Sequence, residues 1–243
     1  MKFEPADLVV WSDAWLLAVN KPAGLPSLPD GYDPGAPYLR SVLEAEFGKL
    51  WMIHRLDKDT SGLVLLARTA EAHRALNTQF EKRQVAKVYH ALVVGDPNWV
   101  EKNVRLPLRP DGDRKHRTVV DPQRGKPAHT DLRVLERFGL YTLVECIPHT
   151  GRTHQIRVHL MAQGHPVAAD GLYSNGVGIF LSEFKPAYRG SRQGECPLLE
   201  RAGLHARSLT FLHPANGVVQ QLEAPYPKDF GGALRQLRRH SRR

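Results

Sequence analysis

The sequence predicts an α+β fold in which strands predominate and helices are few. Short apolar runs suited to buried strands recur along the 243 residues, whereas only three stretches carry apolar residues at helical spacing. Glycine, proline and polar residues break the chain between these segments at short intervals. Because no stretch has the composition of an interdomain linker, we expect one domain over residues 1–234. The basic residues 235–243 are expected to form a disordered tail.

The predicted elements follow a simple order along the chain. A strand, a turn at Ser12 and Asp13, and a second strand come first, and a loop follows at residues 20–24. Helices are predicted over residues 38–47, over 70–82 with Thr69 as N-cap, and from a cap near Thr153 to a stop at Gly164. Further strands are predicted at residues 63–67, 86–95, 129–138, 140–148, 205–214 and 217–225.

The chain is strongly basic, with 34 lysine and arginine residues against 25 aspartate and glutamate residues and a formal net charge of +9. Basic domains commonly bind polyanions, because each neutralised phosphate releases counterions. Residues 105–126, a polar and basic arm, and residues 235–243 are candidates for such contacts, although a purely solvated role fits them equally well. The N-terminus has no signal-peptide pattern, and no apolar run approaches about 18 residues. We therefore expect a cytoplasmic protein that enters no membrane.

Residues 52–68, MIHRLDKDTSGLVLLAR, place Asp57 among basic residues immediately before an apolar run. One interpretation is structural, because Asp and Ser often stabilise turns and strand starts. The other is a nucleophile or base at the mouth of a sheet, kept ionised by the neighbouring Arg55. Carboxylates of this kind attack anomeric carbons, yet no second carboxylate forms the pair that is usual in glycosidases. Spacing by itself leaves both interpretations open.

Residues 54–62, HRLDKDTSG, closely resemble the signature of the RluA-type pseudouridine synthases. Five more motifs match in the order of the family: VNKPAGLPS (19–27), KVYHALVVG (87–95), GKPAHTDLRVLER (125–137), HTGRTHQIRVHLMAQGHPV (149–167) and LHARSLTFLHP (204–214). His54 favours this branch over the related RsuA type, which usually has glycine there. The resemblance implies the fold of these synthases, a mixed, largely antiparallel sheet flanked by helices and loops.

The resemblance also implies an RNA isomerase. Such enzymes turn a uridine in RNA into pseudouridine: the N-glycosidic bond breaks, the base rotates, and it rejoins the ribose through carbon. The resemblance assigns Asp57 as the catalytic nucleophile or base at the ribose, and it leaves open an adduct at C1′ or elimination to a glycal. Tyr89 matches the tyrosine that stacks on the target base and takes part in the final deprotonation. Arg157 matches the basic residue that pairs with the catalytic carboxylate.

Four further residues are predicted to contact the substrate. The resemblance assigns Arg55 to displacing or replacing the flipped nucleotide, since the target base must leave its stack. Leu204 is assigned to the lining of the uracil pocket. His54 belongs to the same signature as the catalytic carboxylate, and His154 shares a face with Arg157 on the predicted helix.

Other chemistries have signatures that this sequence lacks. It has neither the His-x-Glu and Pro-Cys-x-x-Cys patterns of zinc nucleobase deaminases nor a P-loop or G-x-G-x-x-G turn. His149, His154 and His159 are five residues apart, which scatters them around a helix and argues against a metal site. We therefore expect no cofactor and no metal ion.

The expected partner is a structured RNA, ribosomal or transfer RNA, with no DNA and with a monomer as the default. One rival hypothesis is a catalytically silent RNA-binding protein with the same fold, which the presence of Asp57, Tyr89 and Arg157 disfavours. A second rival is a glycoside or nucleoside hydrolase built on the lone carboxylate. The sequence departs from the family at Ala169, where many members have glycine before the aspartate, and residues 170–203 match no motif. Substrate contacts in this region are open.

Overall fold

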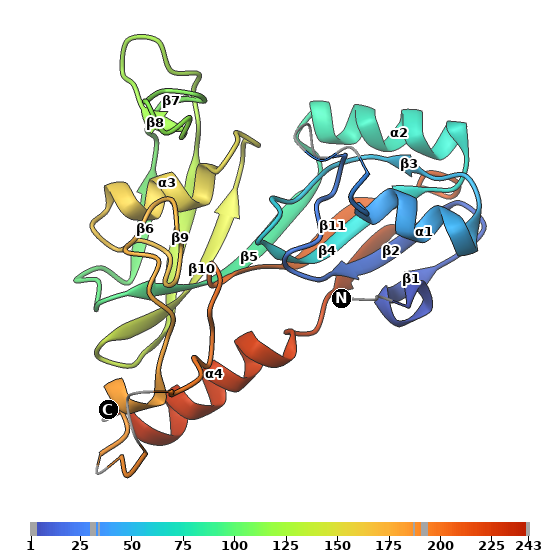
Figure 1. The fold of residues 1–243 in the computed structure, drawn as a ribbon. Coiled ribbons are helices and arrows are strands. Elements are labelled where there is room, and N and C mark those ends of the chain that lie inside the picture. Colours follow the sequence, from blue (N-terminus) through green and yellow to red (C-terminus); the bar gives the residue numbers. More distant parts are fainter. Residues whose placement is uncertain (1–3, 30–32, 34, 187, 191–193, 242–243) are drawn as a thin grey trace. The chain divides into compact units, whose positions relative to one another are not determined.

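The chain divides into two compact units that the sequence does not mark. The computed structural model describes residues 4–29, 33, 35–186, 188–190 and 194–241 (Figure 1). Unit 1 comprises Met1–Val88 and His205–Pro225, and unit 2 comprises Tyr89–Leu204 and Tyr226–Arg243. The sequence predicted one domain over residues 1–234 because it shows no linker. Two of the boundaries between the units fall inside strands, β5 (Ala86–Val94) and β11 (Leu204–Leu212), and therefore leave no linker composition in the sequence.

Unit 1 is built on a mixed sheet. Its elements are the 3₁₀ helix η1 (Pro5–Leu8), β1 (Val9–Ser12), β2 (Leu16–Lys21), α1 (Leu39–Phe47), β3 (Trp51–Met52), β4 (Ser61–Ala67), α2 (Ala70–Glu81), the start of β5, most of β11, and β12 (Val219–Glu223). The strand order is β1-β2-β4-β11-β12, with β3 also paired to β4. β4 and β11 are parallel, and the other neighbours are antiparallel.

Strand β4 is the centre of the unit 1 core. Each of its residues, Ser61 to Ala67, is buried, as the sequence predicts for an apolar run too short to be a helix. Leu76 of α2 and Phe211 of β11 belong to the same cluster of buried side chains. The N-cap predicted for α2 is confirmed, since Thr69 Oγ1 accepts a hydrogen bond of 3.1 Å from the amide of Ala72.

Gly62 allows β4 and β11 to approach each other where they pair in parallel. Its φ is 118°, and a Cβ added there would lie 2.3 Å from the carbonyl oxygen of Ala206 and 2.6 Å from its amide nitrogen. Both atoms belong to the backbone of a paired strand and cannot move aside. The glycine of the HRLDKDTSG motif is therefore a packing requirement of the sheet that follows Asp57.

Replacing Gly62 with alanine is expected to destabilise the protein by more than about 3 kcal/mol or to prevent folding, because the methyl group overlaps fixed backbone. Gly48→Ala is the matched control in the same unit. Gly48 also has a positive φ, 71°, but nothing lies within 4 Å of its added Cβ, so a loss near 1 kcal/mol is expected. Urea unfolding measures both. Equal losses would mean that the left-handed backbone, and not the close approach, sets the cost.

Unit 2 contains an antiparallel sheet of order β5-β10-β9-β6. Its elements are the rest of β5, β6 (Glu101–Val104), β7 (Leu108–Arg109), β8 (Val119–Val120), β9 (Thr130–Arg137), β10 (Tyr141–Pro148), α3 (Gln155–Ala162), the 3₁₀ helix η2 (Leu181–Glu183) and α4 (Lys228–His240). β7 and β8 form a small hairpin within the basic arm, residues 105–126 (Figure 1). The predicted α+β class with a mixed, largely antiparallel sheet is confirmed.

The C-terminal segment differs from the predicted disordered tail, residues 235–243. Residues 235–240 belong to α4, which carries a buried apolar face formed by Phe230, Ala233, Leu234 and Leu237. On its polar side, Arg238 Nε lies 2.8 Å from a carboxylate oxygen of Glu136. The arginine count suggested a tail, but the apolar residues between the arginines recur at helical spacing and bind the helix to the core. Residues 242 and 243 lie outside the described part of the chain.

Candidate active site

Asp57 lies in the loop between β3 and β4 and is half-buried. The amide of Thr60 donates a hydrogen bond of 3.2 Å to the Asp57 carbonyl, which closes a turn directly before β4 begins at Ser61. The carboxylate is thus carried by one turn at the start of a fully buried strand. This is the placement that the HRLDKDTSG signature suggests, and it gives the side chain a rigid support.

The end of β2 and the loop that follows it, residues 21–27, hold the backbone on both sides of Asp57. Ser27 Oγ accepts a hydrogen bond from the amide of Leu56 at 3.1 Å and donates to the carbonyl of the same residue at 2.8 Å. After Asp57, the carbonyl of Lys58 accepts from the amide of Gly24 at 2.9 Å and from Lys21 Nζ at 3.1 Å. The residue before Asp57 and the residue after it are therefore both fixed to the VNKPAGLPS segment.

Lys21 is the most unusual member of this arrangement, because its side chain is completely buried. Its ammonium group also donates to the carbonyls of Pro22 at 2.9 Å and Leu25 at 2.8 Å. With the carbonyl of Lys58, these bonds match the three protons that an ammonium group carries. Sequence reasoning assigned no role to Lys21 or Ser27, although both lie in a motif that it used to recognise the family.

His54 packs against the core of unit 1. Its Nε2 accepts a hydrogen bond of 3.0 Å from the amide of Leu65 in β4, and its ring stacks on Phe80 with centroids 5.0 Å apart. Burial, assisted by the positive charge of Lys87, lowers the pKa of His54 from 6.5 to about 3. The imidazole is therefore neutral at pH 7 and supports the loop that carries Asp57. Its predicted contact with substrate stays a prediction.

The His54→Gln variant is expected to lose less stability than the wild type when the pH is lowered. The folded pKa of about 3 lies below the unfolded value, so the unfolded chain binds the proton first and stability falls as the pH drops from 6.5 towards 3. Between pH 7 and pH 5 the wild type should lose roughly 2 kcal/mol more than His54→Gln, whose amide oxygen still accepts from Leu65. Urea unfolding at both pH values measures the difference. The same loss in both proteins would mean that folded His54 protonates readily.

Arg157 of α3 is buried in unit 2 and forms a two-pronged ion pair with Asp170. Its Nε and Nη2 lie 2.6 and 2.7 Å from the two carboxylate oxygens, and its guanidinium lies over the ring of Tyr173, 5.0 Å from the centroid. Burial raises the pKa of the fully buried Asp170 carboxyl, but hydrogen bonds and charge from Arg157 outweigh this effect and leave the pKa below its usual value. The pair fixes the orientation of the guanidinium.

His154 is the N-cap of α3 and does not lie inside the helix, because α3 begins at Gln155, two residues after the predicted cap. Its backbone is left-handed, with a φ of 54°. Its Nδ1 lies 2.9 Å from the hydroxyl of Tyr173, the residue that also stacks under Arg157. His154 and Arg157 thus both contact Tyr173. The sequence did not indicate Tyr173, because this residue lies in the region that matches no motif.

Tyr89 and Leu204 belong to one apolar cluster of unit 2. Leu204 is buried, and the half-buried Tyr89 packs against the cluster, to which Ile156 of α3 also belongs. Ile156 is the neighbour of Arg157 in sequence, so unit 2 brings these predicted site residues to one region. Arg55 is exposed in the loop of Asp57 in unit 1. The catalytic and substrate-binding roles of all these residues stay predictions.

Replacing Asp170 with asparagine is expected to destabilise the protein by about 3–5 kcal/mol, because it removes a fully buried carboxylate from its two-pronged pair with the buried Arg157 guanidinium. Glu136→Gln is the control in the same unit. It removes the partner of Arg238 from a largely exposed pair and should cost less than about 1 kcal/mol. Chemical unfolding of both variants checks this, and comparable losses would contradict the assigned importance of burial.

The comparisons with known proteins give one consistent result. A model of the RNA pseudouridylate synthase family matches residues 15–162. The ribosomal large subunit pseudouridine synthase C of Escherichia coli (strain K12) is 38% identical over 239 residues, which cover 96% of this chain and 70% of the relative. The chain belongs to the RNA pseudouridylate synthase family. The predicted RluA-type resemblance is thereby confirmed, and this family member is an RNA uridine-to-pseudouridine isomerase.

Further relatives of this synthase agree in sequence and in fold. The ribosomal large subunit pseudouridine synthase D of Neisseria meningitidis serogroup B (strain ATCC BAA-335 / MC58) is 35% identical over 241 residues, which cover 97% of this chain and 62% of the relative. The solved structure of human RNA pseudouridylate synthase domain containing 4 has a TM-score of 0.71 at 26% identity, covering 96% of this chain and 95% of that chain.

Proposed function

We propose that this synthase modifies ribosomal RNA of the large subunit and that Asp57 is its catalytic carboxylate. The supporting observation is the position of Asp57: one turn before the buried strand β4, with Leu56 and Lys58 on either side hydrogen-bonded to residues 21–27. A carboxylate that only caps a turn does not need this support. A carboxylate that must reach one atom of a bound ribose does.

The proposed reaction conserves all atoms of the uridine. Asp57 acts at the ribose, by attack at C1′ or by removing a proton next to it, and the bond between C1′ and N1 of uracil breaks. The freed base turns so that C5 faces C1′, and a carbon–carbon bond forms. In the attack route the bond between Asp57 and C1′ breaks as this bond forms, and in the elimination route Asp57 returns the proton that it took from the ribose. C5 then loses its proton and N1 gains one, which restores the aromatic base. Stacking by Tyr89 would hold the base during the turn, and Tyr89 would assist the deprotonation.

The remaining predicted residues support this centre in the proposal. The buried pair with Asp170 gives Arg157 a fixed direction, which suits a cation that keeps the catalytic carboxylate ionised. The exposed Arg55 takes the place of the flipped nucleotide, which compensates the lost stacking of the target base. Leu204 would line the uracil pocket. His54 and His154 would each contact the substrate.

The large-subunit target is proposed from the relatives, which are ribosomal large subunit pseudouridine synthases C and D. The basic arm fits a structured RNA. Within it, Arg109 pairs with Asp121 at 2.6 Å and Arg117 with Asp113 at 2.7 Å, which stiffens the hairpin. Exposed basic residues surround these pairs: Arg105, Arg114, Lys115, Arg124 and Lys126. They are placed to neutralise phosphates of an RNA backbone.

The proposed setting is the cytoplasm, with the chain acting as a monomer on RNA and binding neither DNA nor a membrane. Among the residues that the structure describes, no helix is both long and apolar enough to cross a membrane. The net charge of +9 favours a polyanionic partner. The site needs no cofactor in this proposal, because the reaction rearranges bonds of one substrate without oxidation or transfer to a second molecule.

Replacing Asp57 with asparagine is expected to lower the rate at least about 1,000-fold, because the amide can neither attack nor take a proton. Melting temperature and RNA affinity should stay nearly unchanged. The assay is tritium release from unmodified large-subunit ribosomal RNA that carries [5-³H]uridine, since the new bond at C5 expels the label. Bulk transfer RNA carrying the same label runs in parallel.

Asp59→Asn is the control, because Asp59 is an exposed carboxylate of the same loop and should leave the rate within a few-fold of wild type. If Asp57→Asn lowered the stability of the protein and left the reaction rate unchanged, the Asp57 carboxylate would have a structural role in the turn. Release from transfer RNA alone would overturn the ribosomal target and keep the catalytic assignment.

A further inference from the structure

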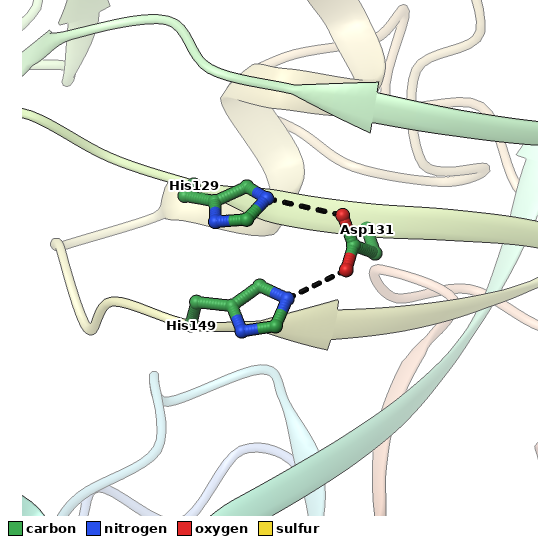
Figure 2. A group of neighbouring side chains, drawn as sticks. All are labelled: His129, Asp131 and His149. Atoms are coloured by element: carbon green, nitrogen blue, oxygen red, sulfur yellow. Dashed lines mark hydrogen bonds and ion pairs between the residues drawn. The ribbon is translucent and has the colours of Figure 1, made fainter.

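Three side chains that play no part in the proposed reaction converge at one end of the unit 2 sheet. His129 precedes β9, Asp131 is its second residue, and His149 directly follows β10. Figure 2 shows both imidazoles directed at the one carboxylate that lies beside them. His129 and Asp131 are half-buried and His149 is exposed, so the cluster is open to solvent on one side.

The strand register explains why these three residues meet. Alternate residues of a strand point to the same face, which places His129 and Asp131 together. Thr130 pairs with Pro148 in the antiparallel ladder, so the next residues outward, His129 and His149, lie opposite each other. Their rings stack with centroids 4.1 Å apart and planes at 16°.

Short polar contacts join the side chains of the cluster. His149 Nε2 lies 2.6 Å from one oxygen of Asp131, and His129 Nε2 lies 3.1 Å from the other. The side-chain nitrogen of Asn103 lies 2.6 Å from His129 Nε2. That ring nitrogen can donate to Asp131 or accept from Asn103, but not both. The same Asn103 nitrogen also donates to Asp131 Oδ1, so three short contacts meet at this carboxylate.

We propose that His129, Asp131 and His149 form a binding site for a divalent transition-metal ion, with zinc as the best-suited metal. A cation between the three side chains gives the ring lone pairs and the carboxylate a shared partner. The imidazoles then bind through Nε2 atoms that carry no proton, with the one proton of each neutral ring on Nδ1. Neither the resemblance to the synthases nor the proposed reaction involves such an ion.

The spacing of the ligand atoms suits zinc. Ligand atoms at about 2.0–2.1 Å from a tetrahedral zinc ion lie about 3.3 Å apart. The three ligand atoms here lie within 4.8 Å of one another, and the stacked rings would turn to direct both Nε2 lone pairs at the ion. Two imidazoles and one carboxylate suit zinc, whereas magnesium and calcium prefer oxygen ligands. The fourth position faces solvent and accepts water or an external donor.

The backbone that carries two of the ligands is already fixed. The amide of His129 donates to Thr150 Oγ1 at 2.9 Å, and its carbonyl accepts from the amide of His149 at 3.0 Å. The same carbonyl accepts from Gln155 Nε2 at 2.9 Å. The fold therefore already positions the backbone of these ligands, and metal binding loses less conformational entropy as a result.

The sequence argued against a metal because it placed His149 on a helix with His154 and His159. In the structure, His149 lies before α3, in the segment that follows β10. Its partners are 18 and 20 residues earlier, on the neighbouring strand, and only the strand register connects them.

The test is zinc binding to the full-length protein without a histidine tag. We expect one zinc ion per chain by equilibrium dialysis, and cobalt should give the visible absorption of a tetrahedral site. His149→Ala and Asp131→Asn should each weaken zinc binding at least about tenfold. Zinc should raise the melting temperature of the wild type and not that of His149→Ala. Magnesium should produce neither effect.

His116→Ala is the matched control. His116 is exposed and lies 2.5 Å from Asp111, so it forms a histidine–aspartate pair in the same unit, outside the three-residue cluster. Zinc affinity in His116→Ala should equal that of the wild type. The proposal is overturned if the wild type binds no stoichiometric zinc, or if the folded His149→Ala and Asp131→Asn variants, checked by circular dichroism, bind it as tightly as the wild type.

Discussion

The buried ammonium of Lys21 is the constraint on which the placement of Asp57 depends. A charge without solvent is costly unless hydrogen bonds surround it, and here carbonyl groups from two separate loops provide them. Two of the carbonyls belong to residues 22–25 and the third belongs to Lys58. The ammonium therefore links the two loops directly beside the residue between Leu56 and Lys58.

Unit 2 also contains a buried charged residue, Asp170, that is surrounded by hydrogen-bond partners. Asp170 is completely buried and accepts hydrogen bonds from Arg157 and from the backbone amides of Leu172 and Tyr173. The residue before Asp170, Ala169, has a left-handed backbone with a φ of 57°. An alanine in this conformation costs about 1–2 kcal/mol.

The hydrogen bonds of Lys21 and the pair of Arg157 with Asp170 each fix a candidate site residue next to a buried element. β4 is buried throughout, and β11 approaches it closely at Gly62, one residue after the turn that begins at Asp57 meets the strand. Arg157 lies on a helix whose first residue, Gln155, is hydrogen-bonded to Thr150 and to His129. The loop that carries Asp57 and the helix that carries Arg157 are thus each attached to a buried element of their own unit.

The sequence by itself determined the strands other than β3, β6, β7 and β8, three of the helices, the family and the identity of the candidate catalytic residues. These depend on local patterns: an apolar run at 63–67, a cap at Thr69, and motifs in which neighbouring residues act together. Only the tertiary structure decided the two units, the helix over Lys228–His240, the role of Lys21, the partner of Arg157 and the meeting of His129 with His149. Each of these depends on contacts between residues distant in sequence or on burial of one face. Composition and spacing do not record which strand lies beside which, and that pairing decides where a buried charge finds its partners.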